Sequence, residues 1–233
     1  MARVAMVSGA GRGLGFAIAD KLLTDGWSLS LGLRDQSQAK RFDVGPERLH
    51  VGHFDATDPA SAEQWVNGTV DRFGQIDALV NNVGVLRMVD FEQGSEEDLD
   101  DLWAINVKAP FWLIRAALPY LKATGAGRVF NIASTDAKRF RPGTSVGYSM
   151  TKHALLAMTQ AVRHAGWGEG VRATALCPGA IDTDLIANLP GVTPKVDRLT
   201  PETVAEMVAF ILALPNQASV PEFIVNTRLE TLI

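Results

Sequence analysis

A tyrosine and a lysine four residues apart are the side chains with the clearest chemical potential in this sequence. Tyr148 and Lys152 begin a segment whose apolar residues recur at helical spacing, so both side chains share one helix face. A neighbouring ammonium favours the ionised phenol, so the pair is expected to lower the tyrosine pKa toward a range useful for proton exchange with an alcohol or carbonyl oxygen. Taken alone, the spacing is far more often that of an ordinary half-buried tyrosine and a solvated lysine.

Two further polar residues strengthen the catalytic interpretation. Ser134 directly follows a predicted strand, and the carboxyl ends of strands are where ligands meet an open α/β sheet. Ser134 is therefore well placed to hydrogen-bond a substrate oxygen. Asn106 follows an amphipathic stretch earlier in the chain. The candidate catalytic residues are Asn106, Ser134, Tyr148 and Lys152.

A glycine-rich stretch after the first apolar run is a second candidate site. Residues 8–15 read SGAGRGLG, and the pattern Gly9-x-x-x-Gly13-x-Gly15 fits neither G-x-G-x-x-G nor a P-loop. Without a Cβ the backbone turns tightly and approaches a ligand closely, while N–H groups at a helix start face negative charge. The stretch is a candidate pyrophosphate cradle, although a glycine-rich turn after a strand is a purely structural turn about as often.

The elements that must position these residues alternate along the chain. Seven short apolar runs predict strands at 4–7, 29–33, 49–54, 78–81, 129–133, 171–176 and 223–225. Helix boundaries are indicated by Ser95 and Thr200 as N-caps and by Gly26 and Gly74 as stops. Strands that alternate with helices predict an α/β fold with a parallel sheet covered on both faces. We expect one domain over residues 1–233, a doubly wound, seven-stranded parallel sheet with helices on both faces.

Composition excludes several function classes. The 233 residues are 47% hydrophobic and 21% charged, with a net charge of −4 and no block of like charge, which argues against nucleic-acid or membrane-surface binding. A single cysteine, Cys177, excludes an internal disulfide framework, and the four histidines show no ligand spacing, so no metal site is expected. Because no signal peptide or membrane-length apolar stretch is visible, a cytoplasmic location is expected.

Taken in order, these motifs resemble the short-chain dehydrogenase/reductase family over nearly the whole chain. The resemblance is carried by Ser8-Gly9-x-x-x-Gly13-x-Gly15, Asp55, Asn81-Asn82-Val83-Gly84, Asn106, Ser134, Tyr148-x-x-x-Lys152 and Pro178-Gly179-x-x-x-Thr183. It implies a Rossmann fold, and it implies that Tyr148 is the proton donor in carbonyl reduction and the acceptor in alcohol oxidation. Lys152 would lower its pKa and hold the nicotinamide ribose, Ser134 would orient the substrate oxygen, and Asn106 would support a water-linked proton relay.

The resemblance also implies a set of cofactor contacts. Asp55 would bind the adenine amino group, Asn82 and Gly84 would lie along the adenosine ribose, and residues 178–183 would wrap the nicotinamide. The expected cofactor-binding residues are Ser8, Gly9, Arg12, Gly13, Leu14, Gly15, Arg34, Asp55, Ala56, Asn82, Gly84, Tyr148, Lys152, Pro178, Gly179, Ile181 and Thr183. Residues 180–195 are expected to contain a short substrate lid.

Two neighbouring residues predict opposite cofactors. Asp35 lies 20 residues beyond Gly15, a spacing that signals NAD through the ribose 2′-hydroxyl. In the family's pattern, however, Leu33 takes the acidic position and Arg34 the next one, where a guanidinium grips a 2′-phosphate. Arg12 adds a second cation, so NADP(H) is favoured over NAD(H).

The sequence thus predicts an NADP(H)-dependent oxidoreductase that moves a hydride between the nicotinamide and a carbonyl/secondary alcohol pair, as a homodimer or homotetramer. The alternatives are a catalytically idle dinucleotide-binding sensor or scaffold, an NAD-dependent alcohol dehydrogenase of the same family, and a nucleotide-sugar epimerase. Lys138, Arg139 and Arg141 follow Ser134 and would attract an acidic substrate, although solvated loop charge is the more ordinary interpretation.

Overall fold

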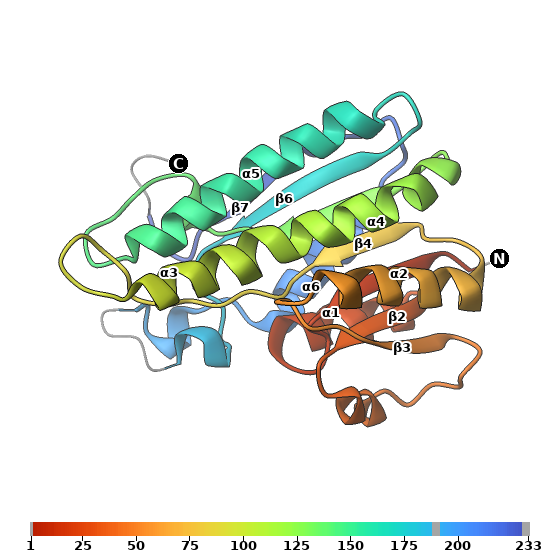
Figure 1. Ribbon diagram of the computed structural model, residues 1–233, viewed down its shortest axis with the longest axis horizontal. Coiled ribbons are helices and arrows are strands. Elements are labelled where there is room, and N and C mark those ends of the chain that lie inside the picture. The colour runs from red at the N-terminus through yellow and green to blue at the C-terminus, as the bar shows by residue number, and fades with distance from the viewer. Residues whose placement is uncertain (1, 188–191, 230–233) are drawn as a thin grey trace.

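One parallel sheet in the order β3-β2-β1-β4-β5-β6-β7 organises the chain (Figure 1). The structure, a computed structural model, describes residues 2–187 and 192–229. Within those residues the strands are β1 (Val4–Ser8), β2 (Ser28–Leu33), β3 (Leu49–His53), β4 (Ala78–Asn81), β5 (Arg128–Ile132), β6 (Arg172–Pro178) and β7 (Glu222–Val225). The predicted parallel sheet is confirmed, and each predicted strand overlaps an observed one.

The strands could be predicted from the sequence because each apolar run reflects the burial of its strand. β1, β2, β4 and β5 are buried along their whole length, since a parallel sheet is covered on both faces and its inner strands have no solvent side. An edge strand such as β7 is only partly buried, and its apolar run is correspondingly shorter.

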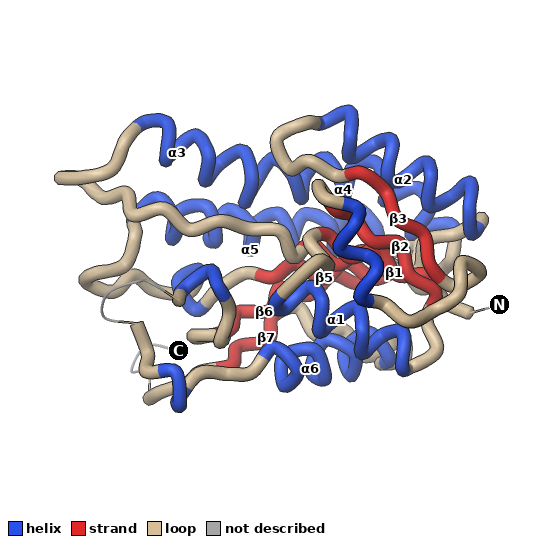
Figure 2. Tube along the Cα trace, turned by 90° about the horizontal axis from the view of Figure 1, so that it is seen from below, coloured by secondary structure: helices blue, strands red, loops and turns tan. Residues whose placement is uncertain are grey.

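Helices cover both faces of the sheet, as Figure 2 shows. Helices α1 and α6 lie together on one face, where Ile18, Leu22 and Val208 join one buried cluster, while α2, α4 and α5 lie on the other, where Trp65 and Leu113 join a second cluster. The helices are α1 (Gly13–Thr24), α2 (Pro59–Phe73), α3 (Glu96–Trp103), α4 (Ala109–Ala123), α5 (Val146–Gly166) and α6 (Pro201–Ala213).

The predicted helix boundaries are confirmed by their caps. The Ser95 hydroxyl accepts the N–H of Asp98 at the start of α3, and Thr200 accepts the N–H of Thr203 at the start of α6. Gly74 ends α2 in the left-handed conformation, with φ of 76°. Short polar side chains and glycine therefore set these ends locally.

The winding of the sheet reverses between β1 and β4, which are neighbours although two strands separate them in the chain. Ligands of open α/β sheets bind in the crevice outside the carboxyl ends of the strands at such a switch point. The reversal therefore brings the turns after β1, β2, β4, β5 and β6 to one crevice.

Candidate active site

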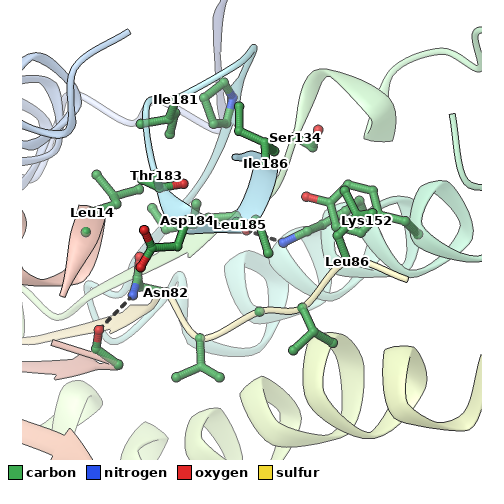
Figure 3. A pocket seen from close by; sticks show the side chains of 18 of the residues that line it. Leu14, Asn82, Leu86, Ser134, Lys152, Ile181, Thr183, Asp184, Leu185 and Ile186 are labelled. Carbon is green, nitrogen blue, oxygen red and sulfur yellow. Dashed lines mark hydrogen bonds between the residues drawn. The ribbon is translucent and has the colours of Figure 1, made fainter. Parts of the chain in front are cut away.

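A cleft of about 1080 Å³ lies at the carboxyl edge of the sheet. Figure 3 shows Leu14 and Asn82 on one side of it and Ser134, Lys152 and Leu86 on the other. The predicted site residues that line it are Gly9, Arg12, Gly13, Leu14, Gly15, Arg34, Asp55, Ala56, Asn82, Gly84, Ser134, Tyr148, Lys152, Pro178, Gly179, Ile181 and Thr183. Two predicted residues, Ser8 and Asn106, do not line it.

The glycine turn has a backbone conformation and a close packing that favour glycine. Gly9 and Gly13 have φ of 67° and 52°, in the left-handed region that favours glycine. A Cβ on Gly15 would collide with the Gly9 carbonyl and come within 2.5 Å of Asn82 Nδ2. Helix α1 starts here, and Arg12 at its N-cap gives its N–H groups no side-chain cap. A close-packed cradle of backbone donors at a helix start fits a pyrophosphate.

Ser8 fixes the glycine turn through hydrogen bonds to the loop after β4. Its hydroxyl accepts the N–H groups of Asn82 and Val83 at 2.9 and 3.1 Å, and Asn82 Nδ2 donates to the Ser8 carbonyl at 2.9 Å. Ser8 is buried. These bonds tie the end of β1 to the loop after β4, so Ser8 positions the cradle and its hydroxyl does not face the cleft.

Acidic side chains at the strand ends are already engaged. Asp35 accepts Ser37 N–H and Oγ–H at 3.0 and 2.7 Å, and Asp55 accepts the same two groups of Thr57 at 2.8 and 2.7 Å. These hydrogen bonds hold the pKa of each carboxyl below its usual value. Arg34, by contrast, is exposed on the cleft wall beyond β2.

Two residues of this region carried no sequence signal. The Gln38 side chain lies directly over Gly11, where any Cβ would collide with it, and it lines the cleft. Arg41 donates to the Gly11 carbonyl at 2.8 Å and stacks on the Phe16 ring at 4.1 Å. Both approach the glycine turn through tertiary folding of the segment after β2.

The predicted Tyr–Lys pair occupies the first two turns of α5. Lys152 Nζ lies 5.5 Å from the centroid of the Tyr148 ring and donates to the Ile132 carbonyl at 2.8 Å. Tyr148 and Lys152 are only 7% and 5% exposed. Ser145 caps the helix by accepting the N–H of Tyr148 at 3.1 Å. Ser134, after β5, completes this corner of the cleft.

The expectation that Lys152 lowers the pKa of Tyr148 is wrong for this structure. Burial raises the pKa of Tyr148, the negative charge of Asp136 raises it further, and a hydrogen bond with Ser134 opposes the shift only in part. Burial also lowers the pKa of Lys152 to about 8. Tyr148 is therefore a neutral phenol at neutral pH, the protonation state of a proton donor.

Asn106 holds the loop after β4 against α5. It lies in a π-helical turn, Ala104–Lys108, between α3 and α4. Its Nδ2 donates to the Val85 carbonyl and to Thr151 Oγ1 at 3.0 and 3.1 Å, and its Oδ1 accepts Val85 N–H at 2.9 Å. A Cβ on Gly84 would stand 3.3 Å from Oδ1 and 3.6 Å from Lys152 Nζ. The Asn106 side chain thus fixes the loop that passes Lys152.

A parallel sheet with a glycine-lined crevice at its switch point defines an α/β protein of the dinucleotide-binding type. Residues 3–191 match the short chain dehydrogenase family, and the chain belongs to this family of oxidoreductases.

Named relatives agree with this class. An agropine synthesis reductase of Rhizobium rhizogenes is 39% identical over 220 residues, which are 94% of this chain and 51% of that protein, so the chain spans about half the length of this relative. An uncharacterized oxidoreductase of Staphylococcus saprophyticus is 31% identical over 96% of this chain and 97% of its own length.

Solved structures share the fold closely. An alcohol dehydrogenase from the archaeon Thermococcus sibiricus, complexed with 5-hydroxy-NADP, superposes with a TM-score of 0.89 at 31% identity and covers 99% of this chain and 100% of its own. A 3-ketoacyl-(acyl-carrier-protein) reductase from Brucella melitensis, complexed with NADH, has a TM-score of 0.87 at 26% identity over 96% of both chains. Across residues 2–187 and 192–229, no helix is both long and apolar enough to cross a membrane.

Proposed function

We propose that the protein is an NADP(H)-dependent oxidoreductase that transfers a hydride between the nicotinamide and a carbonyl/secondary alcohol substrate. One observation carries this proposal. A buried, neutral Tyr148 stands beside Ser134 and Lys152 in the same cleft whose other side is the glycine turn. A proton donor and a dinucleotide cradle in one cleft are what carbonyl reduction requires.

Each residue has a defined task in this reaction. The bound nicotinamide supplies the hydride, and the protein supplies position and electrostatics. Ser134 donates to the substrate oxygen and orients it, while Tyr148 gives that oxygen its proton as negative charge develops there. Lys152 Nζ has three N–H donors and donates one to the Ile132 carbonyl, which leaves two for ribose hydroxyls. Asn106 keeps the neighbouring loop in place through its hydrogen bonds with Val85.

The cofactor preference rests on the end of β2. The Asp35 carboxylate caps the turn that follows it and is occupied by Ser37, which disfavours the ribose contact typical of NAD. Arg34 stays exposed on the cleft wall, available to a 2′-phosphate. Around the nicotinamide we place Pro178, Gly179, Ile181 and Thr183.

We further propose that residues 1–233 act as one domain, in a homodimer or homotetramer in the cytoplasm. Phe111 is a half-exposed aromatic side chain on α4, the helix that we propose for this association. Of the proposed lid, residues 188–191 lie outside the described part of the chain.

The test uses purified protein, NADPH or NADH, and a panel of ketones, 3-oxo acids and quinones. We expect NADPH oxidation with at least one carbonyl, and a loss of about 10²- to 10⁴-fold in kcat for Tyr148→Phe with NADPH binding retained. Tyr120→Phe is the matched control, because Tyr120 is the only other tyrosine and does not line this cleft. Unchanged turnover by Tyr148→Phe contradicts the mechanism, whereas tight NADPH binding without turnover of any carbonyl favours an idle sensor.

A further inference from the structure

The loop between the two catalytic segments carries an arginine that the proposed reaction does not use. Arg141 lies midway between Ser134 and Tyr148 in the chain, and its side chain lines the cleft together with theirs. Arg141, Pro142, Gly143 and Thr144 form a turn in which Thr144 N–H and Oγ–H donate to the Arg141 carbonyl at 3.2 and 2.6 Å. The position of Arg141 is therefore set by the backbone that leads into α5.

This turn is held in shape by its own sequence. Proline at the second position and glycine with φ of 80° at the third are the requirements of a type II turn. The next residue, Ser145, caps α5 and exchanges hydrogen bonds with the backbone N–H and carbonyl of Val89, each at 3.2 Å. The loop that carries Arg141 is therefore fixed by hydrogen bonds to its own turn and to Val89.

The guanidinium of Arg141 keeps its hydrogen-bonding capacity. Its Nη2 lies 3.7 Å from Asp136 Oδ1, beyond hydrogen-bond distance, while the same oxygen receives a hydrogen bond from Arg139 Nη1 at 2.6 Å. Arg141 Nε is buried and has no hydrogen-bond partner. Within residues 2–187 and 192–229, the guanidinium therefore makes no hydrogen bond.

An arginine in this state favours a planar anion. A carboxylate can accept from the two Nη groups of a guanidinium together, an end-on arrangement that does not need the buried Nε. Arg139 Nη1 and Arg141 Nη2 lie 2.6 and 3.7 Å from Asp136 Oδ1, so the negative charge of Asp136 does not face Arg141 alone. The 34% exposure of the Arg141 side chain leaves its end accessible from the cleft.

Apolar residues define the remainder of the substrate end. Its lining includes Val85, Leu86, Met88, Leu185 and Ile186. An aliphatic chain between the reacting carbon and the anion would pack against these side chains and lose its contact with water.

Building on the proposed function, we infer that Arg141 selects the substrate: the protein acts on aliphatic oxo acids, or the corresponding hydroxy acids, and binds their carboxylate through this guanidinium. Ser134 and Tyr148 then hold the carbonyl oxygen at the other end of the same molecule. The inference assigns to Arg141 a role in specificity and none in the proton transfer itself.

The test compares methyl-ketone acids that have one to four methylenes between carbonyl and carboxylate, each paired with its uncharged methyl ester. With NADPH saturating, we expect at least one acid to exceed its ester in kcat/KM by about 10- to 100-fold, carried mainly by KM. In Arg141→Gln the acid-to-ester ratio should fall to about one. In Arg141→Lys it should fall to an intermediate value, because lysine keeps the positive charge but lacks the paired N–H donors that bind both carboxylate oxygens.

Lys138→Met is the matched control. It removes a nearby positive charge, and Lys138 pairs with Glu222 and does not line the cleft. Its acid-to-ester ratio should stay that of the wild type. A wild-type ratio near one throughout the series, or a preference that survives in Arg141→Gln, overturns the inference while leaving the carbonyl reductase standing.

Calorimetric binding separates this inference from the proposed function. The same acids and esters are titrated into wild type and Arg141→Gln in the presence of NADP⁺. An acid preference that depends on Arg141 supports the inference even if no compound is turned over, and that lack of turnover would count against the reductase alone. Equal binding of acid and ester overturns the inference.

Discussion

The two ends of the cleft are built in opposite ways. At the proposed catalytic end Ser134, Tyr148 and Lys152 are buried, and the helix that carries two of them is capped beside them. At the end proposed for the adenosine, Arg12 and Arg34 are exposed, and Arg12 Nη1 pairs with Asp184 Oδ2 at 3.0 Å. Changes at the buried end should therefore alter stability together with chemistry, whereas changes at the exposed end should alter cofactor affinity alone.

The glycine turn between the two ends should give the largest effect. In Gly15→Ala the new methyl group meets the Gly9 carbonyl and Asn82 Nδ2, so the turn must shift. We expect the free energy of unfolding to fall by about 2–3 kcal/mol and NADPH binding to weaken more than about tenfold.

Gly168→Ala is its control, because a Cβ there meets nothing within 4 Å and its φ is not positive. Its unfolding free energy should change by less than about 0.5 kcal/mol. Denaturant unfolding and NADPH fluorescence titration measure both variants. Equal behaviour of the two alanines would show that the turn is not a close-packed cradle.

Much of this arrangement could be predicted from the sequence, because its causes are local. Buried parallel strands leave continuous apolar runs, and helix ends such as Ser95 and Gly74 are set by one residue and its neighbours. The order of the motifs then predicts that Ser134 and Tyr148 reach one crevice, as the cleft confirms.

The rest depends on tertiary environment, which spacing does not encode. An i, i+4 pair says that Tyr148 and Lys152 share a face, but not how deeply they are buried, and the depth of burial reverses the expected direction of the tyrosine pKa. The inward turn of the Ser8 hydroxyl and the approach of Gln38 to Gly11 likewise arise only when distant segments meet.

At the buried end, the ionisation of Lys152 should make the free energy of unfolding depend on pH. The pKa of Lys152 is about 8 in the fold and about 10.5 in the unfolded chain, so between these values the unfolded state binds more protons. The penalty for burying this ammonium is fully present below pH 8 and is relieved as pH rises, so the fold gains stability through that window. Between pH 7 and pH 10 the gain should be about 2 kcal/mol relative to Lys152→Met, in which it is absent.

Chemical denaturation of both proteins at several pH values measures this difference. Subtracting the two curves cancels groups that titrate alike in each. A difference that is flat from pH 7 to pH 10 would mean that Lys152 keeps its ordinary pKa despite its burial.

At the exposed end, Arg34→Ala should change cofactor choice without destabilising the fold. We expect NADPH affinity to fall about tenfold while NADH affinity stays within about twofold, because only NADPH carries the 2′-phosphate that a guanidinium grips. Lys40→Ala controls for the loss of one nearby positive charge, since Lys40 is exposed and does not line the cleft. Fluorescence titration with both cofactors measures this preference. A wild-type preference for NADH would contradict the proposal and would indicate that Asp35 binds the ribose 2′-hydroxyl.

The smallest effect should come from Asp184→Asn. The Arg12–Asp184 pair is so exposed, at 74% and 77% of the two side chains, that its loss should leave unfolding unchanged within about 1 kcal/mol. Cofactor binding should change, however, because removing the carboxylate frees Arg12 and takes a negative charge from a cleft that must accept the phosphates of NADPH. NADPH affinity should therefore rise about two- to threefold, and this gain should shrink at high salt. In Arg12→Gln the same Asp184→Asn change should give a smaller gain, since no guanidinium is released; an equal gain in both backgrounds would assign the effect to the charge of Asp184 alone.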